Sequence, residues 1–230
     1  MKEALLNSSY FGLILSIFFF MLAVQLKAKF RLAILNPLLV STIMIVAILV
    51  IFQIPYEEYK ASANLLSYLL TPATVCLAIP MYKQLRLLKD NLVAVLAAIT
   101  AGTLSSILSI FLMGKLFGLS PEHISTLLPK SITTAIGMGV SEEAGGIVTL
   151  TVAAIVMTGI LGNMIAETVF HLFHIDHPIA RGLALGTSAH AVGTAKALEL
   201  GEIEGAMGSI SICVAGILTV ALVPLVMNFA

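Results

Sequence analysis

Long apolar stretches recur along almost the whole of this chain, and they limit its fold more than any other feature. Runs that can span a hydrocarbon layer of roughly 30 Å predict membrane helices. Only 10% of the 230 residues are charged, whereas about a quarter are charged in a soluble domain. The chain is therefore predicted to be an all-α polytopic membrane protein. The apolar windows are 9–26, 33–54, 62–82, 91–117, 147–170, 179–197 and 206–229, with a shorter and more polar segment at 127–141.

Basic residues in short loops predict the orientation of the chain, because Lys and Arg collect on the cytoplasmic side of a membrane. Two basic loops, 27–32 and 83–90, follow the first and third windows, and the loop between them, PYEEYK, is net acidic. Both basic loops are therefore predicted to lie inside, with the N-terminus outside. The chain has eight transmembrane helices if segment 127–141 crosses the membrane, and seven if that segment is re-entrant. The sequence leaves this choice open.

No Ser/Gly-rich linker or charge run divides the chain, so residues 1–230 are predicted to form a single integral membrane domain. A faint internal repeat aligns LTPATVCLAIPM (70–81) with LPKSITTAIGM (128–138). A rival register pairs TPAT (71–74) with TSAH (187–190), and chance similarity between apolar segments is the alternative to both. Internal repeats with interrupted helices are typical of secondary transporters.

Proline and glycine interrupt three of the apolar segments. Pro72 and Pro80 bracket one small-residue stretch, Pro129 opens PKSITTAIGMGVSEEAGG, and GTSAHAVGTAK places small and hydroxyl residues between glycines. Proline removes a helical hydrogen bond, and backbone groups freed in a membrane must be satisfied by protein or by water in a cavity. The three segments are predicted to be broken or re-entrant helices that line a polar site. The alternative is that their small residues only allow close helix packing.

A few ionisable residues lie inside the apolar segments, where a charge is costly and usually faces a cavity or a partner. Lys130 stands beside three hydroxyl residues, and a cation with hydroxyls and helix-end amides suits a small carboxylate. Snorkelling of this lysine to the membrane interface is the alternative. His190 is expected either to relay protons or to form a hydrogen bond between helices. Glu167 is expected either to pair with a basic group or to carry a proton.

Enzymatic and cofactor chemistry find little support in the chain. Ser188 and His190 are two residues apart, so on a helix they point to different faces and do not form a hydrolytic dyad. The run HLFHIDHP (171–178) gives three histidines a spacing that permits a metal site, but it ends in proline at a helix end, and no metal is predicted. No Gly-rich phosphate loop or HExxH motif is present. We expect a protein that is not an enzyme, has no cofactor and, at zero formal net charge, binds no nucleic acid.

Four stretches of the chain resemble the LrgB/CidB family of bacterial inner-membrane proteins, which are also described as holin- or antiholin-like. They are PKSITTAIG, SEEAGG, HPIARGLALGTSAHAVGTAKALELGEIEGA and the terminal GILTVALVPL. The resemblance covers nearly the whole chain and is strongest from Leu128 to Pro224. The usual family form of the first motif is closer to PKSVTTPIA. Ala135 replaces the second proline here, which predicts a milder helix break.

The resemblance implies two functions. One is control of murein hydrolase activity and cell lysis, together with a small LrgA/CidA-type membrane partner. The other is transport of small monocarboxylates such as pyruvate, or glycolate and glycerate as in the related plastid envelope protein. A carboxylate carrier needs a lysine, a histidine and hydroxyls on interrupted helices, whereas a hole-forming or regulatory oligomer does not. We therefore expect a secondary transporter or facilitator of small 2-oxo or 2-hydroxy monocarboxylates in the cytoplasmic membrane, most simply as a homo-oligomer.

The expected substrate site combines the lysine, the histidine and nearby hydroxyls. Lys130 and helix-end amides are expected to hold the carboxylate. His190, whose ordinary pKa lies near ~6.5, is expected to face segment 129–134 across a polar pocket and to bind substrate or couple protons, with Glu167 as a second proton carrier. ELGEIEG (199–205) is predicted to be a loop before the last helix. The hydroxyl contacts are expected from Ser131, Thr133, Thr134, Thr187, Ser188 and Thr194.

Overall fold

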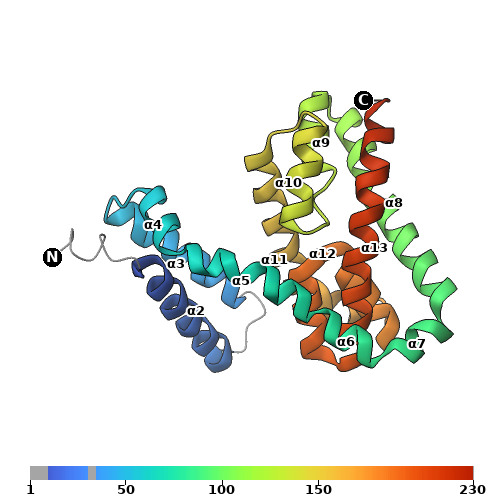
Figure 1. The fold of residues 1–230 in the computed structure, drawn as a ribbon, viewed down its shortest axis with the longest axis horizontal. Coiled ribbons are helices and arrows are strands. Elements are labelled where there is room, and N and C mark those ends of the chain that lie inside the picture. The colour runs from blue at the N-terminus through green and yellow to red at the C-terminus, as the bar shows by residue number, and fades with distance from the viewer. Residues whose placement is uncertain (1–9, 31–34, 230) are drawn as a thin grey trace. The chain divides into compact units, whose positions relative to one another are not determined.

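The computed structural model describes residues 10–30 and 35–229, and the regular secondary structure in them is entirely helical (Figure 1). This confirms the all-α prediction for those residues. The end of the predicted 27–32 loop and the first two residues of the 33–54 window lie outside the described residues. The described helices that are long and apolar enough to cross a membrane are α2, α8, α11 and α13. The count of seven to eight transmembrane helices stays a prediction.

The chain divides into two compact units between Cys76 and Leu77, and each is described by itself. In the first unit, α2 packs against α3 and α4, where the Ser62 hydroxyl accepts a hydrogen bond from the Gly12 amide at 2.9 Å. The Asn36 side chain caps α3 by accepting from the Leu38 amide at 2.9 Å. The helices of this unit are α2 (Phe11–Phe30), α3 (Pro37–Ile51), α4 (Tyr56–Ser62) and α5 (Asn64–Cys76).

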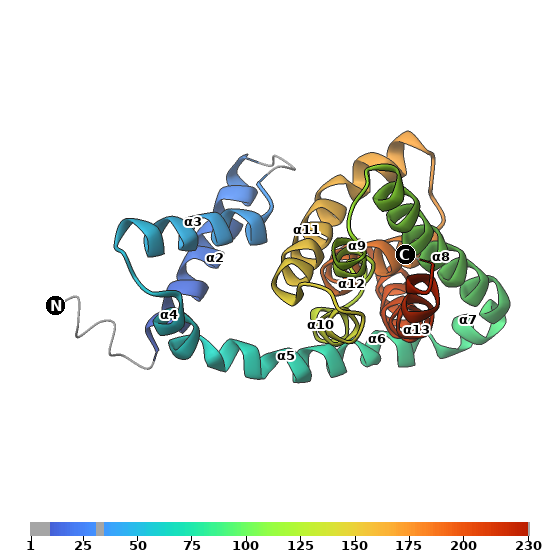
Figure 2. The same ribbon diagram turned by 90° about the horizontal axis from the view of Figure 1, so that it is seen from above.

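The second unit contains the segments that the sequence singles out. Seen from above, α9, α10 and α12 lie between α11 on one side and α8 and α13 on the other (Figure 2). Its core includes Val95, Ile99 and Ile107 of α8 together with Met207 and Val223 of α13. The helices are α6 (Ala78–Lys83), α7 (Leu85–Asp90), α8 (Leu92–Leu116), α9 (Pro121–Leu127), α10 (Thr134–Glu143), α11 (Val148–Leu172), α12 (Pro178–Leu200) and α13 (Glu202–Met227).

Segment 121–143, named here the first hairpin, enters and leaves at the same end of the second unit. It consists of α9, a turn and α10, and neither helix is long enough to span a membrane. At its open end the Thr126 hydroxyl accepts from the Ile147 amide at 2.8 Å, and the Thr151 hydroxyl donates to the Thr126 carbonyl at 2.9 Å. Both bonds join α9 to the start of α11, so the segment has returned to its starting level. This hairpin has the form expected of a re-entrant segment, and its relation to the membrane stays a prediction.

Helix α12 is a second hairpin, because its backbone leaves helical geometry at Ala189 and His190. His190 has a backbone φ of 43°, a value that few residues other than glycine adopt. Beyond this tip, Gly193 lies against the backbone of Leu185, so the second arm (191–200) folds back on the first (178–188). The predicted interruption of the GTSAHAVGTAK segment is confirmed and takes the form of a sharp reversal.

Contacts with α13 give the direction of each arm. In the first arm, Gly182 approaches Glu204 and Gly186 approaches Gly208, so this arm runs parallel to α13. The second arm runs antiparallel to α13, because residues later in this arm approach residues that come earlier in α13. Only Gly201 separates α12 from α13. The prediction of a loop at 199–205 is therefore wrong, because a single extended glycine is enough to reverse the chain here.

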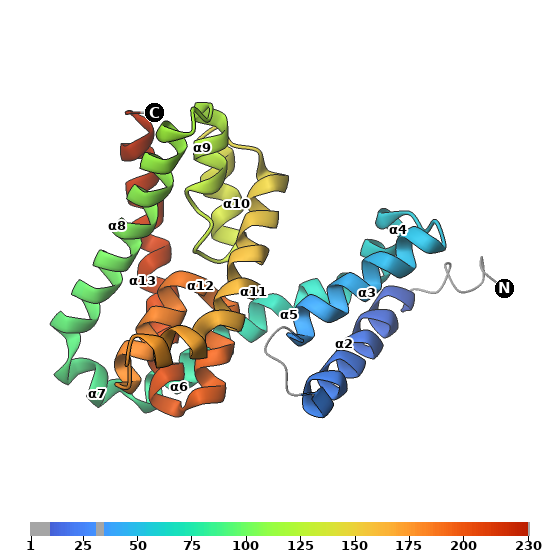
Figure 3. The same ribbon diagram turned by 180° about the vertical axis from the view of Figure 1, so that it is seen from behind.

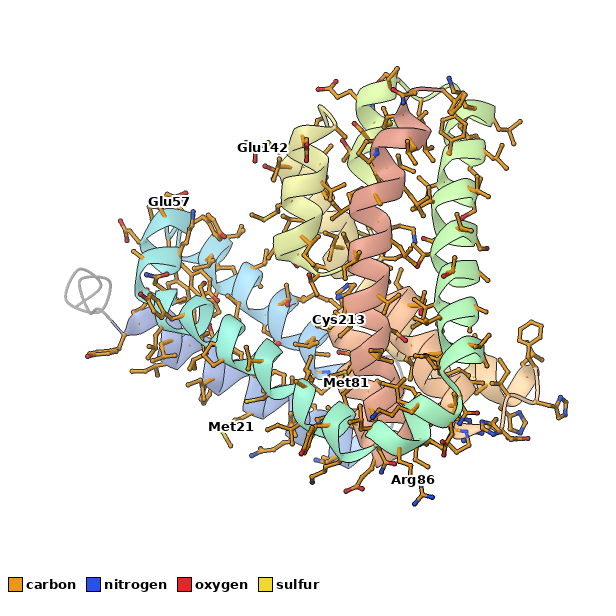
Figure 4. The ribbon with its side chains drawn as sticks, turned by 45° about the vertical axis from the view of Figure 1, so that its right-hand side comes forward. Met21, Glu57, Met81, Arg86, Glu142 and Cys213 are labelled. Carbon is orange, nitrogen blue, oxygen red and sulfur yellow. The ribbon has the colours of Figure 1, made fainter. Side chains whose placement is uncertain are left out.

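The two hairpins enter the second unit from opposite ends, as Figure 3 shows with α9 and α10 above α12. The sequence α8, first hairpin, α11, second hairpin is a pair of helix-and-hairpin repeats in opposite orientation, a pattern found in secondary transporters. The predicted loops 83–90 and PYEEYK are wrong in form, because most of the first is helix α7 and most of the second is helix α4. Arg86 of α7 lies at the end that holds the open end of the second hairpin, and Glu142 lies at the other end (Figure 4). By the positive-inside rule the Arg86 end is predicted to be cytoplasmic.

The prolines expected to break helices lie in different settings. Pro72 lies inside α5, which continues to Cys76, and the interruption follows at Leu77. Pro80 is in the first turn of α6, a position that tolerates proline because its amide has no helical partner. Pro129 is buried in the turn between α9 and α10. Among the three, Pro129 is the one that occupies an interruption.

Candidate functional site

A cavity of about 1050 Å³ lies in the second unit, between α8, α11 and the first arm of the second hairpin. It extends from Asn91 and His177, near the predicted cytoplasmic end, to Lys130 and Ser131 at the tip of the first hairpin. Its walls are mostly small or apolar, and its polar groups gather at the inner end. The polar lining residues are Asn91, Ser105, Ser106, Ser109, Lys130, Ser131, Thr158, His177, Thr187 and Ser188.

The inner end of the cavity lies near the middle of the bundle. The Ser131 hydroxyl is 3.1 Å from that of Ser106, and Ser106 is about 21 Å from the start of α8 and about 15 Å from its end at 1.5 Å per residue. Thr187 of the second hairpin contacts Gly102, which is also a residue of α8. The tips of the two hairpins therefore meet at mid-depth, where PKSITT and GTSAH contribute to one cavity.

Lys130 supplies the positive charge at this inner end. Its side chain is partly buried, and its Nζ donates to the Ser131 hydroxyl at 3.2 Å. The ion pairs found in the described part of the chain do not include Lys130. A cation at membrane depth that has hydroxyls rather than a carboxylate beside it can accept an anionic ligand.

Thr187 and Ser188 bring two hydroxyls to the cavity from the other hairpin. Ser188 is exposed to the cavity, and its hydroxyl donates to the Ala184 carbonyl at 2.7 Å. Thr187 is 8% exposed, and its hydroxyl has no hydrogen-bond partner among the described residues. Its oxygen therefore keeps its full capacity to donate and accept.

A second, much smaller cavity of about 10 Å³ adjoins the first. Ser106, Ser131 and Thr187 line both cavities. Four apolar side chains and two further hydroxyls complete the small cavity. One of these hydroxyls belongs to Thr103, which is buried and has no partner among the described residues. The lining residues are Thr103, Ser106, Ile107, Leu128, Ser131, Ile132, Thr187, Ala215 and Thr219.

His190 does not line either cavity, although it belongs to the hairpin tip. It is 4% exposed, and its Nε2–H donates to the Ile155 carbonyl of α11 at 2.9 Å. Its ring packs on Gly159, where a Cβ atom would lie 2.8 Å from Nε2. This is the hydrogen bond between helices that the sequence offered as one of two roles. The two segments meet as expected, but His190 itself turns away from the cavity towards α11.

The other predicted hydroxyls lie outside the cavity lining. Thr133 is the N-cap residue of α10, and Thr134 is its first residue. Thr194 is fully buried in the second arm, against Gly208 of α13, and its hydroxyl has no partner among the described residues. The structure thus brings together four of the predicted residues, Lys130, Ser131, Thr187 and Ser188, and places these three threonines elsewhere.

Glu167 takes part in an ion pair that joins α11 to the second arm. The Lys196 ammonium lies 2.5 Å from a Glu167 carboxylate oxygen and 3.4 Å from one of Glu199. The lysine side chain is 11% exposed, whereas the two carboxylates are 65% and 58% exposed. Pairing, the first of the two roles expected for Glu167, is the one that the geometry displays. The described residues contain no cluster of His, Cys, Asp or Glu that could hold a metal ion.

The contribution of α8 to the cavity was missed at the sequence level. Asn91, Gly102, Ser105 and Ser109 recur at three- or four-residue steps, with alanines between them, and so form one face of the helix. This periodic polar face was the available signal. This pattern alone does not distinguish a cavity lining from a packing face, because small residues in an apolar helix are equally typical of close packing.

Comparison with known proteins gives a consistent result over the whole length. The profile of the LrgB-like family matches residues 16–229. The antiholin-like protein LrgB of Bacillus cereus (strain B4264) is 35% identical over 221 residues, which is 96% of each chain. The antiholin-like protein LrgB of Bacillus anthracis (strain A0248) gives the same values. No solved structure matches the chain.

Proposed function

The chain belongs to the LrgB-like family, and from this premise we propose that it acts as an antiholin-like protein of the bacterial cytoplasmic membrane. The supporting observation is the alignment with antiholin-like proteins over 96% of each chain. The comparisons favour this role over carboxylate transport, because the relatives reported above are named antiholin-like proteins. The proposed role is not enzymatic, and it includes a small membrane partner of the LrgA/CidA type.

A complementation experiment tests the antiholin-like role. In a bacterial host that lacks its own family member, expression of this chain should return autolysis and murein hydrolase activity towards the values of the undeleted strain. Co-expression of the small partner should strengthen the effect. Unchanged autolysis, with both proteins present in the membrane fraction, would contradict the proposal.

A second role, carriage of small monocarboxylates, is favoured by one feature of the cavity. The Lys130 ammonium stands at its inner end with a hydroxyl at 3.2 Å. A charge at membrane depth is costly and is retained where it binds something. A protein that only restrains a partner has no need of a cavity of about 1050 Å³ that ends at such a charge.

The arrangement of the two hairpins also suits a carrier. Two hairpins from opposite ends meet at mid-depth, which leaves the binding position accessible from either end if the hairpins or their neighbours move. The cavity extends from this mid-depth position to Asn91 and His177, at the end predicted to be cytoplasmic.

Uptake into proteoliposomes tests carriage. Purified protein, with and without the small partner, should move labelled pyruvate or glycolate in a saturable manner. Leakage of solutes regardless of charge would indicate a pore instead. If uptake is seen, Lys130→Met should be tested for autolysis as well, because loss of uptake with autolysis control intact would separate the two roles.

A further inference from the structure

The small cavity between the hairpin tips contains two hydroxyls whose behaviour is unusual for threonines in helices. Thr100 and Thr219 return a hydrogen bond to the carbonyl four residues earlier, at 2.7 Å in each case. Thr103 and Thr187, also in helices, form no hydrogen bond with the described residues. They are 5% and 8% exposed. A hydroxyl buried without a partner is unfavourable, so both oxygens are available to a group that enters the cavity.

The size and lining of the small cavity restrict what that group can be. About 10 Å³ is the room that one water-sized group needs. The cavity is edged by five hydroxyl residues from four elements, so it is polar on several sides. These residues are Thr103 and Ser106 of α8, Ser131 of the first hairpin, Thr187 of the second hairpin and Thr219 of α13.

The ammonium group of Lys130 favours a neutral oxygen over a metal cation as the occupant of the small cavity. Lys130 Nζ donates to Ser131 Oγ at 3.2 Å, and Ser131 lines the small cavity. A metal cation there would be held close to an ammonium group, with no carboxylate among the lining residues to offset the repulsion. A neutral hydroxyl or oxo oxygen carries no such penalty.

We propose that the small cavity is a subsite for a single oxygen atom next to the carboxylate of the ligand, with Thr103 and Thr187 as the residues that bind it. The subsite rests on the carrier role proposed above. The carboxylate lies in the large cavity at Lys130, and the adjoining oxygen passes the shared edge formed by Ser131 and Thr187. A ligand without that oxygen leaves both threonines unpaired or paired with a trapped water.

Competition between two acids that differ by one oxygen tests the subsite. Proteoliposomes take up labelled pyruvate while unlabelled 2-hydroxypropionate or propionate is added, and half-inhibiting concentrations are compared. For the unmodified protein, propionate should be weaker by about tenfold or more, since one hydrogen bond left unmade to a buried group corresponds to such a factor. Thr103→Val and Thr187→Val, which remove the hydroxyl and keep the shape, should bring the ratio close to one by weakening 2-hydroxypropionate.

Matched variants separate the hydroxyl from general damage. Thr187→Ser and Thr103→Ser keep the hydroxyl and should keep the preference, and Thr100→Val, less than one helical turn from Thr103 and outside both cavities, should leave it unchanged. The same preference should appear without transport, as greater thermal stabilisation of the detergent-purified protein by 2-hydroxypropionate than by propionate.

Two results would overturn the subsite, and they differ in meaning. Equal inhibition by the two acids, or an equal loss for both acids in the valine variants, removes the subsite and leaves the carrier role standing. Absence of any pyruvate uptake by the unmodified protein, together with no stabilisation by either acid, removes the carrier role and the subsite with it.

Discussion

The two hairpins differ in the width of their turns and in the partner of their lysine. The first hairpin has a broad turn that presents Lys130 to a cavity, and its lysine is paired with a hydroxyl. The second hairpin reverses within two residues, and its lysine, Lys196, is paired with Glu167 of the neighbouring helix. Its arms pack on α13 through glycines. The first hairpin thus places a positive charge at the cavity, and the second places two hydroxyls there on a closely packed frame.

Loss of close packing in the second hairpin is expected to have the largest effect. A Cβ at Gly186 would lie 2.7 Å from Gly208 Cα and from Ser211 Cβ, so Gly186→Val forces the first arm away from α13. We expect destabilisation of at least several kcal/mol, beyond the usual 1–3 kcal/mol of overpacking, because backbone rather than side chain must move. Thermal unfolding in detergent measures it. A melting temperature close to that of the unmodified protein would show that the arm does not pack on α13.

The two lysines provide the next test of the difference between the hairpins. Lys130→Met is expected to reduce carboxylate uptake to background, because it removes the charge from the cavity, while the melting temperature stays level or rises. Lys196→Met removes an ion pair between α11 and the second arm and is expected to lower the melting temperature by a few degrees. Uptake per folded molecule and thermal unfolding, measured on both variants, give the comparison. Equal losses of uptake and stability in both variants would remove the distinction.

The reversal at the second tip gives a smaller and more local effect. His190 adopts a φ of 43° and donates to the Ile155 carbonyl. His190→Ala loses the hydrogen bond and keeps the backbone strain, whereas His190→Gly loses the bond but relieves the strain. We expect the alanine variant to be less stable than the glycine variant by about 1 kcal/mol. Equal stabilities in a denaturant titration would indicate that position 190 is not strained.

Much of this difference could be predicted from the sequence, because it depends on local signals. Pro129 and the glycines of GTSAHAVGTAK mark the two interruptions, and long apolar runs mark α8, α11 and α13 within a few residues of their observed ends. Lys130, Ser131, Thr187 and Ser188 were predicted as neighbours and lie around one cavity. Their role in binding stays a prediction.

The remaining features depend on the three-dimensional reversal of the chain, which has no local signal. Whether His190 faces the cavity or α11 is decided by its positive φ, which sequence patterns do not reveal for a histidine. The pairing of Glu167 with Lys196 requires the second arm to run parallel to α11, and this follows only from the hairpin. Thr103 was overlooked because one threonine in an apolar helix ordinarily bonds to its own backbone.

The smallest expected effect concerns the outer surface of the first hairpin. Gly139 lies in the middle of α10, and a Cβ there would meet nothing within 4 Å. Glycine inside a helix is less stable than alanine by about 0.5–1 kcal/mol, so Gly139→Ala should stabilise the isolated protein by that amount. The same substitution at Gly186 should destabilise it, because there the space is filled by α13. If Gly139→Ala instead lowers the melting temperature only when the small membrane partner is present, the open face of α10 is where that partner packs, and the first hairpin would then be both the carrier of the charge and the point at which its position is controlled.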